Sequence, residues 1–252
     1  MKGVRDEIVL ATKVRLPMAG NCNRSGATRV NIMREIEGSL RRLQTDYIDL
    51  YQSHIDDADT PFEETLQAYD RLIAEGKVRA IGASNHTAAR LAEALQVSER
   101  KHLPRFESLQ PLYNLYDREG FEAELQPLCV KQEIGVIPYY ALAAGFLTGK
   151  YRSEKDLDQS PRGGGVGKKY LNERGLRILG ALDRVAGGLG ATPAQVALAW
   201  LIARPGITAA IASATSLAQF ADLAKGAALT LDAEAMRQLD RASASEAETV
   251  AG

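Results

Sequence analysis

The chain has 252 residues, of which 45% are hydrophobic and 25% charged, as in ordinary soluble globular proteins. Its 31 Lys and Arg residues nearly balance its 32 Asp and Glu residues, and a formal net charge of −1 argues against a nucleic-acid partner. No apolar run is long enough to cross a bilayer, and the first residues lack the apolar core of a secretion signal. The two cysteines, Cys22 and Cys129, have neither disulfide nor metal-ligand spacing. We therefore expect a cytoplasmic protein without nucleic-acid or membrane partners and without a metal site.

Short apolar segments alternate with amphipathic segments along the whole chain. The segments predicted as strands are residues 8–14, 46–54, 78–82, 106–110, 135–139 and 207–211. The residues predicted to cap the intervening helices are Thr28, Thr60, Thr87, Thr192 and Ser216. Strands that alternate with helices form parallel sheets. The prediction is an α/β fold, a (β/α) barrel with about six parallel strands, whereas a complete TIM barrel has eight. We expect one domain over residues 1–240 and a disordered tail over residues 241–252.

The stretch from Ala143 to Lys169 is long and rich in glycine, and we expect a mobile lid there. It contains the segment PRGGGVGKK, which superficially resembles a phosphate-binding loop. That motif requires Ser or Thr after its Gly-Lys pair, and here Lys169 follows Lys168. No predicted strand precedes the segment either, so we reject the phosphate-loop interpretation.

Polar residues stand where the predicted strands end. The segment DYIDLYQSH (46–54) is the clearest case, because its apolar alternation stops at Ser53 and His54. Reacting groups of a parallel α/β barrel project from the carboxyl ends of its strands. The residues at the predicted strand ends are Lys13, His54, Ser84, Asn85, Gln110, Tyr139 and the segment 213–216. Each has a structural alternative: a solvated lysine, a loop histidine, a helix cap, a core amide or a core aromatic ring. Six such strand ends together favour one shared site.

The chain also resembles the aldo/keto reductases, the family of nicotinamide-dependent carbonyl reductases built on a TIM barrel. The matching stretches, in family order, are VLATKV (9–14), SLRRLQTDYIDLYQSH (39–54), GKVRAIGASN (76–85), SLQPLYNL (108–115), IGVIPYYALAAGFLTGKY (134–151) and TPAQVALAWLIARPGITAAIASA (192–214). The resemblance implies NAD(P)H-dependent reduction of aldehydes or ketones to alcohols. The implied partner is a small carbonyl substrate.

The resemblance implies two catalytic residues. Lys13 matches the lysine that lowers the pKa of a proton-donating tyrosine, and His54 matches the histidine that hydrogen-bonds the substrate carbonyl oxygen. In the family, that tyrosine and an aspartate precede the strand that bears the lysine. The twelve residues before Lys13 contain no tyrosine, Tyr139 matches a stacking residue, and Tyr51 lies an odd number of residues from His54. The resemblance thus predicts an N-terminally truncated member that lacks the first two βα units and the Asp/Tyr half of the catalytic tetrad.

The resemblance also implies cofactor contacts. The matching positions are Ser84, Asn85 and Gln110 for the nicotinamide carboxamide, Tyr139 for stacking on its ring, Gly145, Leu147 and Lys150 for the pyrophosphate loop, and Ser213, Thr215, Gln219 and Asp222 for the adenosine and its 2′-phosphate. NADP is the cofactor that the family implies. NAD stays an alternative, because no lysine or arginine stands at the aligned 2′-phosphate positions, although Arg152, Lys168 or Lys225 could supply the charge.

Two further expectations follow. An incomplete barrel leaves open strand edges, and pairing with a second copy would cover them, so we expect a homo-oligomer. The alternative function, from a different class, is a non-catalytic module that binds the nicotinamide cofactor or a protein partner.

Overall fold

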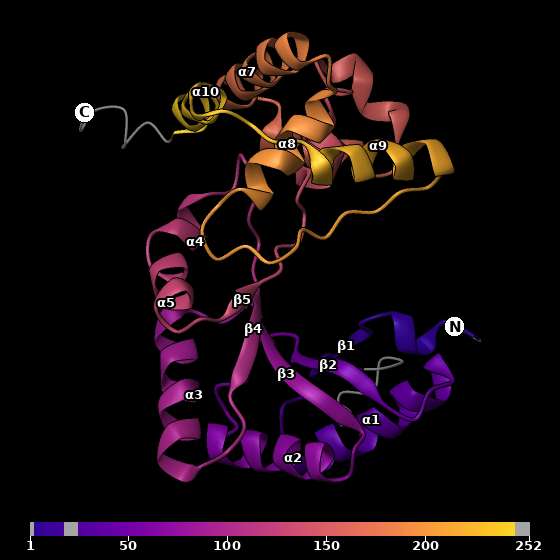
Figure 1. Ribbon diagram of the computed structural model, residues 1–252, viewed down its shortest axis with the longest axis vertical. Coiled ribbons are helices and arrows are strands. Elements are labelled where there is room, and N and C mark those ends of the chain that lie inside the picture. Colours follow the sequence, from indigo (N-terminus) through magenta and orange to yellow (C-terminus); the bar gives the residue numbers. More distant parts are fainter. Residues whose placement is uncertain (1–2, 18–24, 245–252) are drawn as a thin grey trace. The chain divides into compact units, whose positions relative to one another are not determined.

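The computed structural model describes residues 3–17 and 25–244. Cys22 lies outside these residues. The chain divides into two compact units, called the sheet unit and the helical unit below (Figure 1). The sheet unit comprises Met1–Pro111 and Leu128–Gly135, and the helical unit comprises Leu112–Pro127 and Val136–Gly252. The single domain expected over residues 1–240 stays a prediction.

Parallel strands form the centre of the sheet unit. Their bounds are β1 Ala11–Val14, β2 Ile48–Ser53, β3 Val78–Ser84, β4 Phe106–Gln110 and β5 Gly135–Val136. The strand order is the chain order, β1-β2-β3-β4-β5. One register row, the Lys13 row, consists of Lys13, Gln52, Gly82 and Ser108. Residues of one row share a face of the sheet, because neighbouring parallel strands pair in phase. The predicted parallel α/β class is confirmed.

Helices follow β1, β2 and β3 and pack side by side, α1 on α2 and α2 on α3. Their bounds are α1 Arg29–Leu43, α2 Phe62–Ala74 and α3 Ala88–Lys101. Each turns apolar side chains inward at helical spacing: Ile32, Ile36 and Leu40 in α1, for example, are all buried. A short 3-10 helix, η1 Arg5–Glu7, precedes β1, and α5 Leu125–Lys131 precedes β5.

Side-chain caps begin most of these helices where the sequence placed them. The hydroxyl groups of Thr28, Thr87, Thr192 and Ser216 each accept a backbone N–H from the first turn of the following helix. The capping box predicted at Thr60 is wrong. The hydroxyl group of Thr60 donates to Asp57 Oδ2 at 2.9 Å, and α2 begins without a side-chain cap. The Thr60 hydroxyl group thus bonds the loop residue Asp57, and Pro61 occupies the N-cap position of α2.

The helical unit is built mainly from helices. They are α4 Glu119–Glu122, η3 Ala143–Thr148, η4 Glu154–Gln159, α6 Gly163–Tyr170, α7 Glu173–Leu189, α8 Pro193–Ile202, α9 Leu217–Ala228 and α10 Ala233–Ser243. Residues 194–201 of α8 are all buried, and α8 packs on both α7 and α9. No single helix among the described residues is long and apolar enough to cross a membrane. By length and composition α7 and α8 pass that test only as a pair, with a bend of 97° between them.

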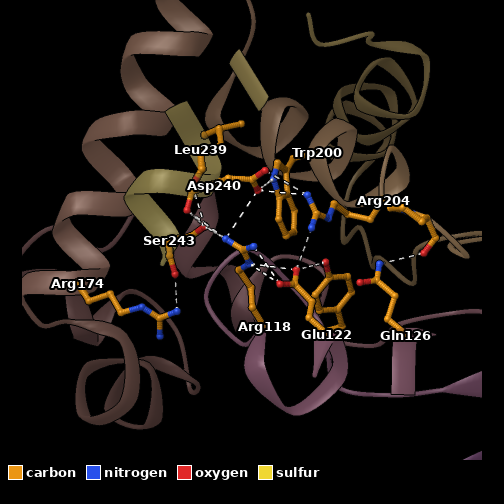
Figure 2. A network of polar contacts seen from close by, with 11 residues as sticks. Arg118, Glu122, Gln126, Arg174, Trp200, Arg204, Leu239, Asp240 and Ser243 are labelled. Atoms are coloured by element: carbon orange, nitrogen blue, oxygen red, sulfur yellow. Dashed lines mark hydrogen bonds and ion pairs between the residues drawn. The ribbon is translucent and has the colours of Figure 1, made fainter. Parts of the chain in front are cut away.

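A polar network joins α4 and α8 to the last helix (Figure 2). The guanidinium group of Arg118 donates to the backbone oxygen of Asp240 at 3.1 Å and to Ser243 Oγ at 2.8 Å. The indole nitrogen of Trp200 donates to Asp240 Oδ1 at 2.9 Å. These contacts hold the end of α10, which extends through Ser243 and so beyond residue 241, where the tail was predicted to begin.

Two of the predicted strands, 207–211 and 135–139, are wrong, whereas the mobile lid expected over Ala143 to Lys169 stays a prediction. Residues 207–211 form no strand; a single bridge joins Ile207 to Val136, and β5 has only two residues. The glycine-rich stretch also contains helices, among them α6, which includes GGGVGKK. Here Gly163 and Gly167 pack directly against Leu157, and a Cβ at either position would overlap that residue. The glycines therefore permit close contact between α6 and η4 rather than a loop.

Candidate active site

Lys13 lies in β1, one residue before the strand ends, with a half-buried side chain. It is the register partner of Gln52 in β2. Burial lowers the pKa of the Lys13 ammonium group. Alternation along the strand directs Val14 to the opposite face, where its side chain is buried. Lys13 is thus the last residue of β1 on its face of the sheet.

His54 follows directly after β2. Its backbone N–H donates to the carbonyl oxygen of Val14 at 3.0 Å, which fixes it beside the end of β1. Burial lowers the pKa of the imidazole, and the positive charge of Lys13 lowers it further. The imidazole is therefore neutral at pH 7, and one of its ring nitrogens carries a proton that it can donate.

Ser84, Asn85 and Gln110 form a connected group at the ends of β3 and β4. Ser84 and Gln110 are register partners, and Ser84 Oγ donates to the backbone oxygen of Gln110 at 2.8 Å. The side-chain amide of Asn85 donates to Ser84 Oγ and to the backbone oxygen of His54, both at 3.0 Å. Asn85 adopts a left-handed conformation with φ of 54°. The sheet unit therefore brings the five predicted residues of β1 to β4 to one edge.

This edge offers complementary hydrogen-bonding groups. Gln110, the last residue of β4, is buried, with 6% of its surface exposed. The side chains of Ser84, Asn85 and Gln110 can donate hydrogen bonds to a carboxamide and accept hydrogen bonds from it. The neutral imidazole and the ammonium group can polarise a carbonyl oxygen.

The helical unit holds the remaining predicted residues. Tyr139 forms a parallel bridge with Leu112, and its half-buried ring meets that of Tyr140 edge-on, with centroids 5.4 Å apart. Burial raises the pKa of Tyr139, and the neighbouring Tyr140 and Asp117 raise it further. Its hydroxyl group therefore stays protonated at neutral pH.

The predicted pyrophosphate loop forms η3, which contains a kink. Ala144 and Gly145 have φ angles of 55° and 94°. The backbone N–H groups of Gly145 and Leu147 both donate to the oxygen of Leu142, at 2.8 and 3.2 Å. The Leu147 side chain is fully buried, whereas Lys150 is exposed. Lys150 is thus the residue of this loop best able to meet an anion.

The predicted adenosine-binding residues lie around the start of α9. Ser213, Thr215 and Gln219 are exposed, and both the backbone N–H and the hydroxyl group of Thr215 donate to Gln219 Oε1. The Asp222 carboxylate accepts from the side-chain amide of Gln195 at 2.6 Å, so it also joins α9 to α8.

Arg152, one of the alternative partners for a 2′-phosphate, makes a bidentate ion pair with Asp183 at 2.7 and 2.8 Å. Its charge is therefore already compensated.

A model of the aldo/keto reductase family matches residues 1–244. The chain belongs to the aldo/keto reductase family. It is 34% identical over 241 residues to the uncharacterized oxidoreductase YrpG of Bacillus subtilis, covering 94% of this chain and 72% of that protein. It is 34% identical to a probable voltage-gated potassium channel subunit beta of Arabidopsis thaliana, covering 85% and 66%. It is 29% identical to L-glyceraldehyde 3-phosphate reductase of Escherichia coli O157:H7, covering 94% and 70%.

Membership in the aldo/keto reductase family assigns the chain to a group of oxidoreductases that bind nicotinamide cofactors. The three relatives are all longer than the chain, which spans about 70% of their length. The family match covers β1 to β4 and their polar edge, and also the elements of the helical unit through α10.

The sequence pattern missed two groups of residues at the polar edge of this aldo/keto reductase. His86 follows Asn85 and is 5% exposed, with Nδ1 at 2.9 Å from the backbone oxygen of Ser84. Its position before the cap residue Thr87 was the available signal. Gln52 and Ser108 belong to the Lys13 row and are buried without side-chain partners among the described residues. A glutamine two residues before His54, on the same face of an apolar strand, was the signal there.

Proposed function

We propose that the protein reduces aldehydes or ketones to alcohols with a nicotinamide cofactor, NADP in preference to NAD. The observation that carries this proposal is the polar edge of the sheet unit. There the connected group Ser84, Asn85 and Gln110 adjoins His54, beside Lys13, through the hydrogen bond from Asn85 to the backbone of His54.

The residues at this edge fit a nicotinamide. The Ser84 hydroxyl group and the amides of Asn85 and Gln110 would hold the carboxamide of the cofactor. The hydrogen bonds that connect Ser84 to Gln110 and Asn85 at the ends of β3 and β4 support this assignment most directly.

When bound, the reduced cofactor supplies a hydride to the carbonyl carbon. His54 orients the substrate by donating a hydrogen bond to the carbonyl oxygen, which gains negative charge as the hydride arrives. The lowered pKa keeps His54 neutral, so it acts as a hydrogen-bond donor rather than as a cation. The Lys13 ammonium group adds a positive charge beside the imidazole and stabilises the developing oxyanion. The oxyanion then takes a proton from water to become the alcohol, since no tyrosine precedes Lys13 in the given sequence.

Assays of turnover and of cofactor binding test this proposal together. NADPH oxidation is followed with a reactive aromatic aldehyde, and binding is followed by the fluorescence of the cofactor. We expect His54→Ala to lower kcat by about 10²–10³-fold, as for the loss of an oxyanion donor, with little change in the Kd of NADPH. His102→Asn is the matched control, since His102 ends α3 in a left-handed conformation that asparagine tolerates. Equal turnover by the His54→Ala variant and the wild type would refute the assigned role.

The cofactor preference has its own test. Titration with NADPH and NADH in parallel measures the contribution of the 2′-phosphate. We expect tighter binding of NADPH and a preference that weakens with salt, because charge pairing of Lys168 or Lys225 with the 2′-phosphate is screened. Equal affinity for the two cofactors would favour NAD as the physiological partner.

The proposal includes a cytoplasmic location, a small carbonyl substrate, no nucleic-acid or membrane partner, and assembly into a homo-oligomer. Size-exclusion chromatography with light scattering measures the mass in solution. A stable monomer over the whole concentration range would refute the oligomer.

The second candidate function is non-catalytic binding of the cofactor by an interaction module. It is supported by the 34% identity to a protein described as a probable voltage-gated potassium channel subunit beta. NADPH binding without aldehyde turnover would favour it, whereas turnover that depends on Lys13 and His54 would favour the enzyme. Absence of binding to either cofactor would refute both functions.

A further inference from the structure

A buried histidine lies directly behind the turn to which we assign the nicotinamide carboxamide. We infer that His86 is a positioning residue that holds the Ser84–Asn85 turn in its ligand-binding conformation. The inference rests on the proposed function for the identity of the ligand. The position of the turn is a property of the sheet unit alone, so it can be tested without the ligand.

The hydrogen bond of His86 fixes the protonation of its ring. Nδ1 lies 2.9 Å from the backbone oxygen of Ser84. A carbonyl oxygen only accepts, so Nδ1 must carry the proton. Burial lowers the pKa of His86, so the ring is neutral and Nε2 is an acceptor. The nearest carboxylate, Asp56, lies 3.8 Å from Nε2 and is bound in a bidentate ion pair by Arg90 at 2.7 and 3.0 Å.

Aromatic residues hold the ring in place. His86 stacks on Phe62 with ring centroids 6.2 Å apart and meets Phe106 edge-on at 5.7 Å. The guanidinium group of Arg90 covers the Phe62 ring at 4.1 Å. These contacts come from the starts of α2, α3 and β4. The direction of the Nδ1–H bond is therefore set by packing and not by a mobile side chain.

The turn that His86 holds is shared by three binding residues. Asn85 has φ of 54°, a left-handed conformation that asparagine tolerates better than most non-glycine residues. Its amide bonds the backbone of His54 and the hydroxyl group of Ser84, which bonds the backbone of Gln110. If the Ser84 carbonyl lost its donor, the peptide between Ser84 and Asn85 could rotate and this sequence of bonds would break.

The variants follow from the geometry of the imidazole. His86→Phe keeps a ring between Phe62 and Phe106 but removes the Nδ1–H donor. His86→Asn removes the ring but places an amide N–H near the position of Nδ1. We expect His86→Phe to raise the Kd and KM of NADPH about tenfold, the effect of about one lost hydrogen bond, with kcat little changed. His86→Asn should restore most of the affinity. A purely structural role would give the opposite order, with His86→Phe the milder substitution.

A second measurement does not require the cofactor. The chain has three histidines, so NMR can resolve the His54 ring signals. The side-chain amide signals of Asn85 are followed in the same experiment. His86→Phe should shift both sets of signals, and the control His102→Asn should shift neither. Unchanged Asn85 signals in His86→Phe, or NADPH affinity equal to that of the wild type, would overturn the inference. If the wild type binds no cofactor while the Asn85 signals shift, the proposed function fails and the positioning role stands.

Discussion

Replacing Glu122 by glutamine should lower the free energy of unfolding of the helical unit and leave the stability of the sheet unit nearly unchanged. Glu122 Oε1 accepts from the hydroxyl group of Tyr113 at 2.6 Å and from Arg118 at 3.0 Å, and Arg118 also donates to Oε2 at 2.9 Å (Figure 2). Arg204 lies 3.4 Å from Oε1. The side chains of Glu122, Arg118 and Arg204 are only 17%, 13% and 18% exposed. A neutral amide would leave two buried guanidinium groups with a single carboxylate, Asp240.

The structure sets the size of this effect. Removing one partner of a fully buried ion pair costs about 3–5 kcal/mol. Residual exposure and the remaining carboxylate reduce this figure, so we expect Glu122→Gln to cost about 2–3 kcal/mol. For a chain of this length that cost lowers the melting temperature by roughly 5–10 °C. Glu234→Gln is the control, because Glu234 pairs with Arg237 and Arg241 on the exposed surface and should be indistinguishable from the wild type.

The pKa of Glu122 determines how the destabilisation by Glu122→Gln changes with pH. Burial would raise the pKa of Glu122, but hydrogen bonds from Arg118 and Tyr113 outweigh it and hold that pKa below its usual value. A carboxylate whose pKa is lowered by folding contributes stability above its unfolded pKa, about 4.3, and loses it as the pH falls through the folded pKa. The difference between the wild type and Glu122→Gln should therefore be full at pH 7 and shrink below about pH 4.

Tryptophan fluorescence measures this unfolding inside the network itself. Trp200 is the single tryptophan of the chain, and its indole nitrogen bonds Asp240. Thermal and urea transitions of the wild type, Glu122→Gln and Glu234→Gln would be compared at pH 7 and at several lower values. A melting temperature of Glu122→Gln within 1–2 °C of the wild type at pH 7 would refute the argument, since about 2 °C is the least that 1 kcal/mol produces. A difference independent of pH would refute the electrostatic part.

Two further predictions concern separate parts of the chain. In NMR titrations His54 should have a pKa below the usual value of about 6.5, and Lys13→Met should raise that pKa while Lys13→Arg leaves it low; no change in Lys13→Met would contradict the coupling. Gly226→Ala should destabilise the packing of α9 on α8 by about 1–3 kcal/mol in urea unfolding, because a Cβ there would lie 2.9 Å from the Cα of Gln195. Gly188→Ala, where a Cβ meets nothing within 4 Å, should instead stabilise α7, and equal effects of the two substitutions would contradict this reasoning.

Local rules predicted much of the sheet unit. Alternation and capping placed β2, β3 and β4 and the starts of α1 and α3, because each rule acts within a few residues. The rules failed where contacts between separate elements determine the local structure. The three-glycine run in PRGGGVGKK suggests a loop, yet Gly163 and Gly167 let α6 lie against Leu157, which no local pattern shows. At Thr60 the predicted cap is likewise absent: its hydroxyl group bonds Asp57, and α2 begins one residue later, after Pro61.

The candidate site was predictable as a set of residues but not as a connected structure. Strand ends and family resemblance named Ser84, Asn85 and Gln110. They did not reveal that the Asn85 amide bonds the backbone of His54, because that bond depends on a left-handed φ. They also missed His86, whose ring is held by residues from α2 and β4. Contacts between separate elements require the register and the packing of those elements.

The register of the strands also explains why Lys13, which is not the last residue of β1, can act with His54, which follows β2, and with the residues that end β3 and β4. Ser84 and Gln110 pair directly, and His54, two residues beyond Gln52, falls in their row. Lys13 pairs with Gln52 and so stands two residues lower, on the same face of the sheet. Two residues of a parallel strand rise about 6.6 Å, close to the length of an extended lysine side chain. An extended Lys13 side chain that leans along the strand is therefore long enough to reach the level of His54, in agreement with the effect of its charge on the pKa of the imidazole. A short side chain at position 13 could not reach that level, so length and charge together account for a lysine there.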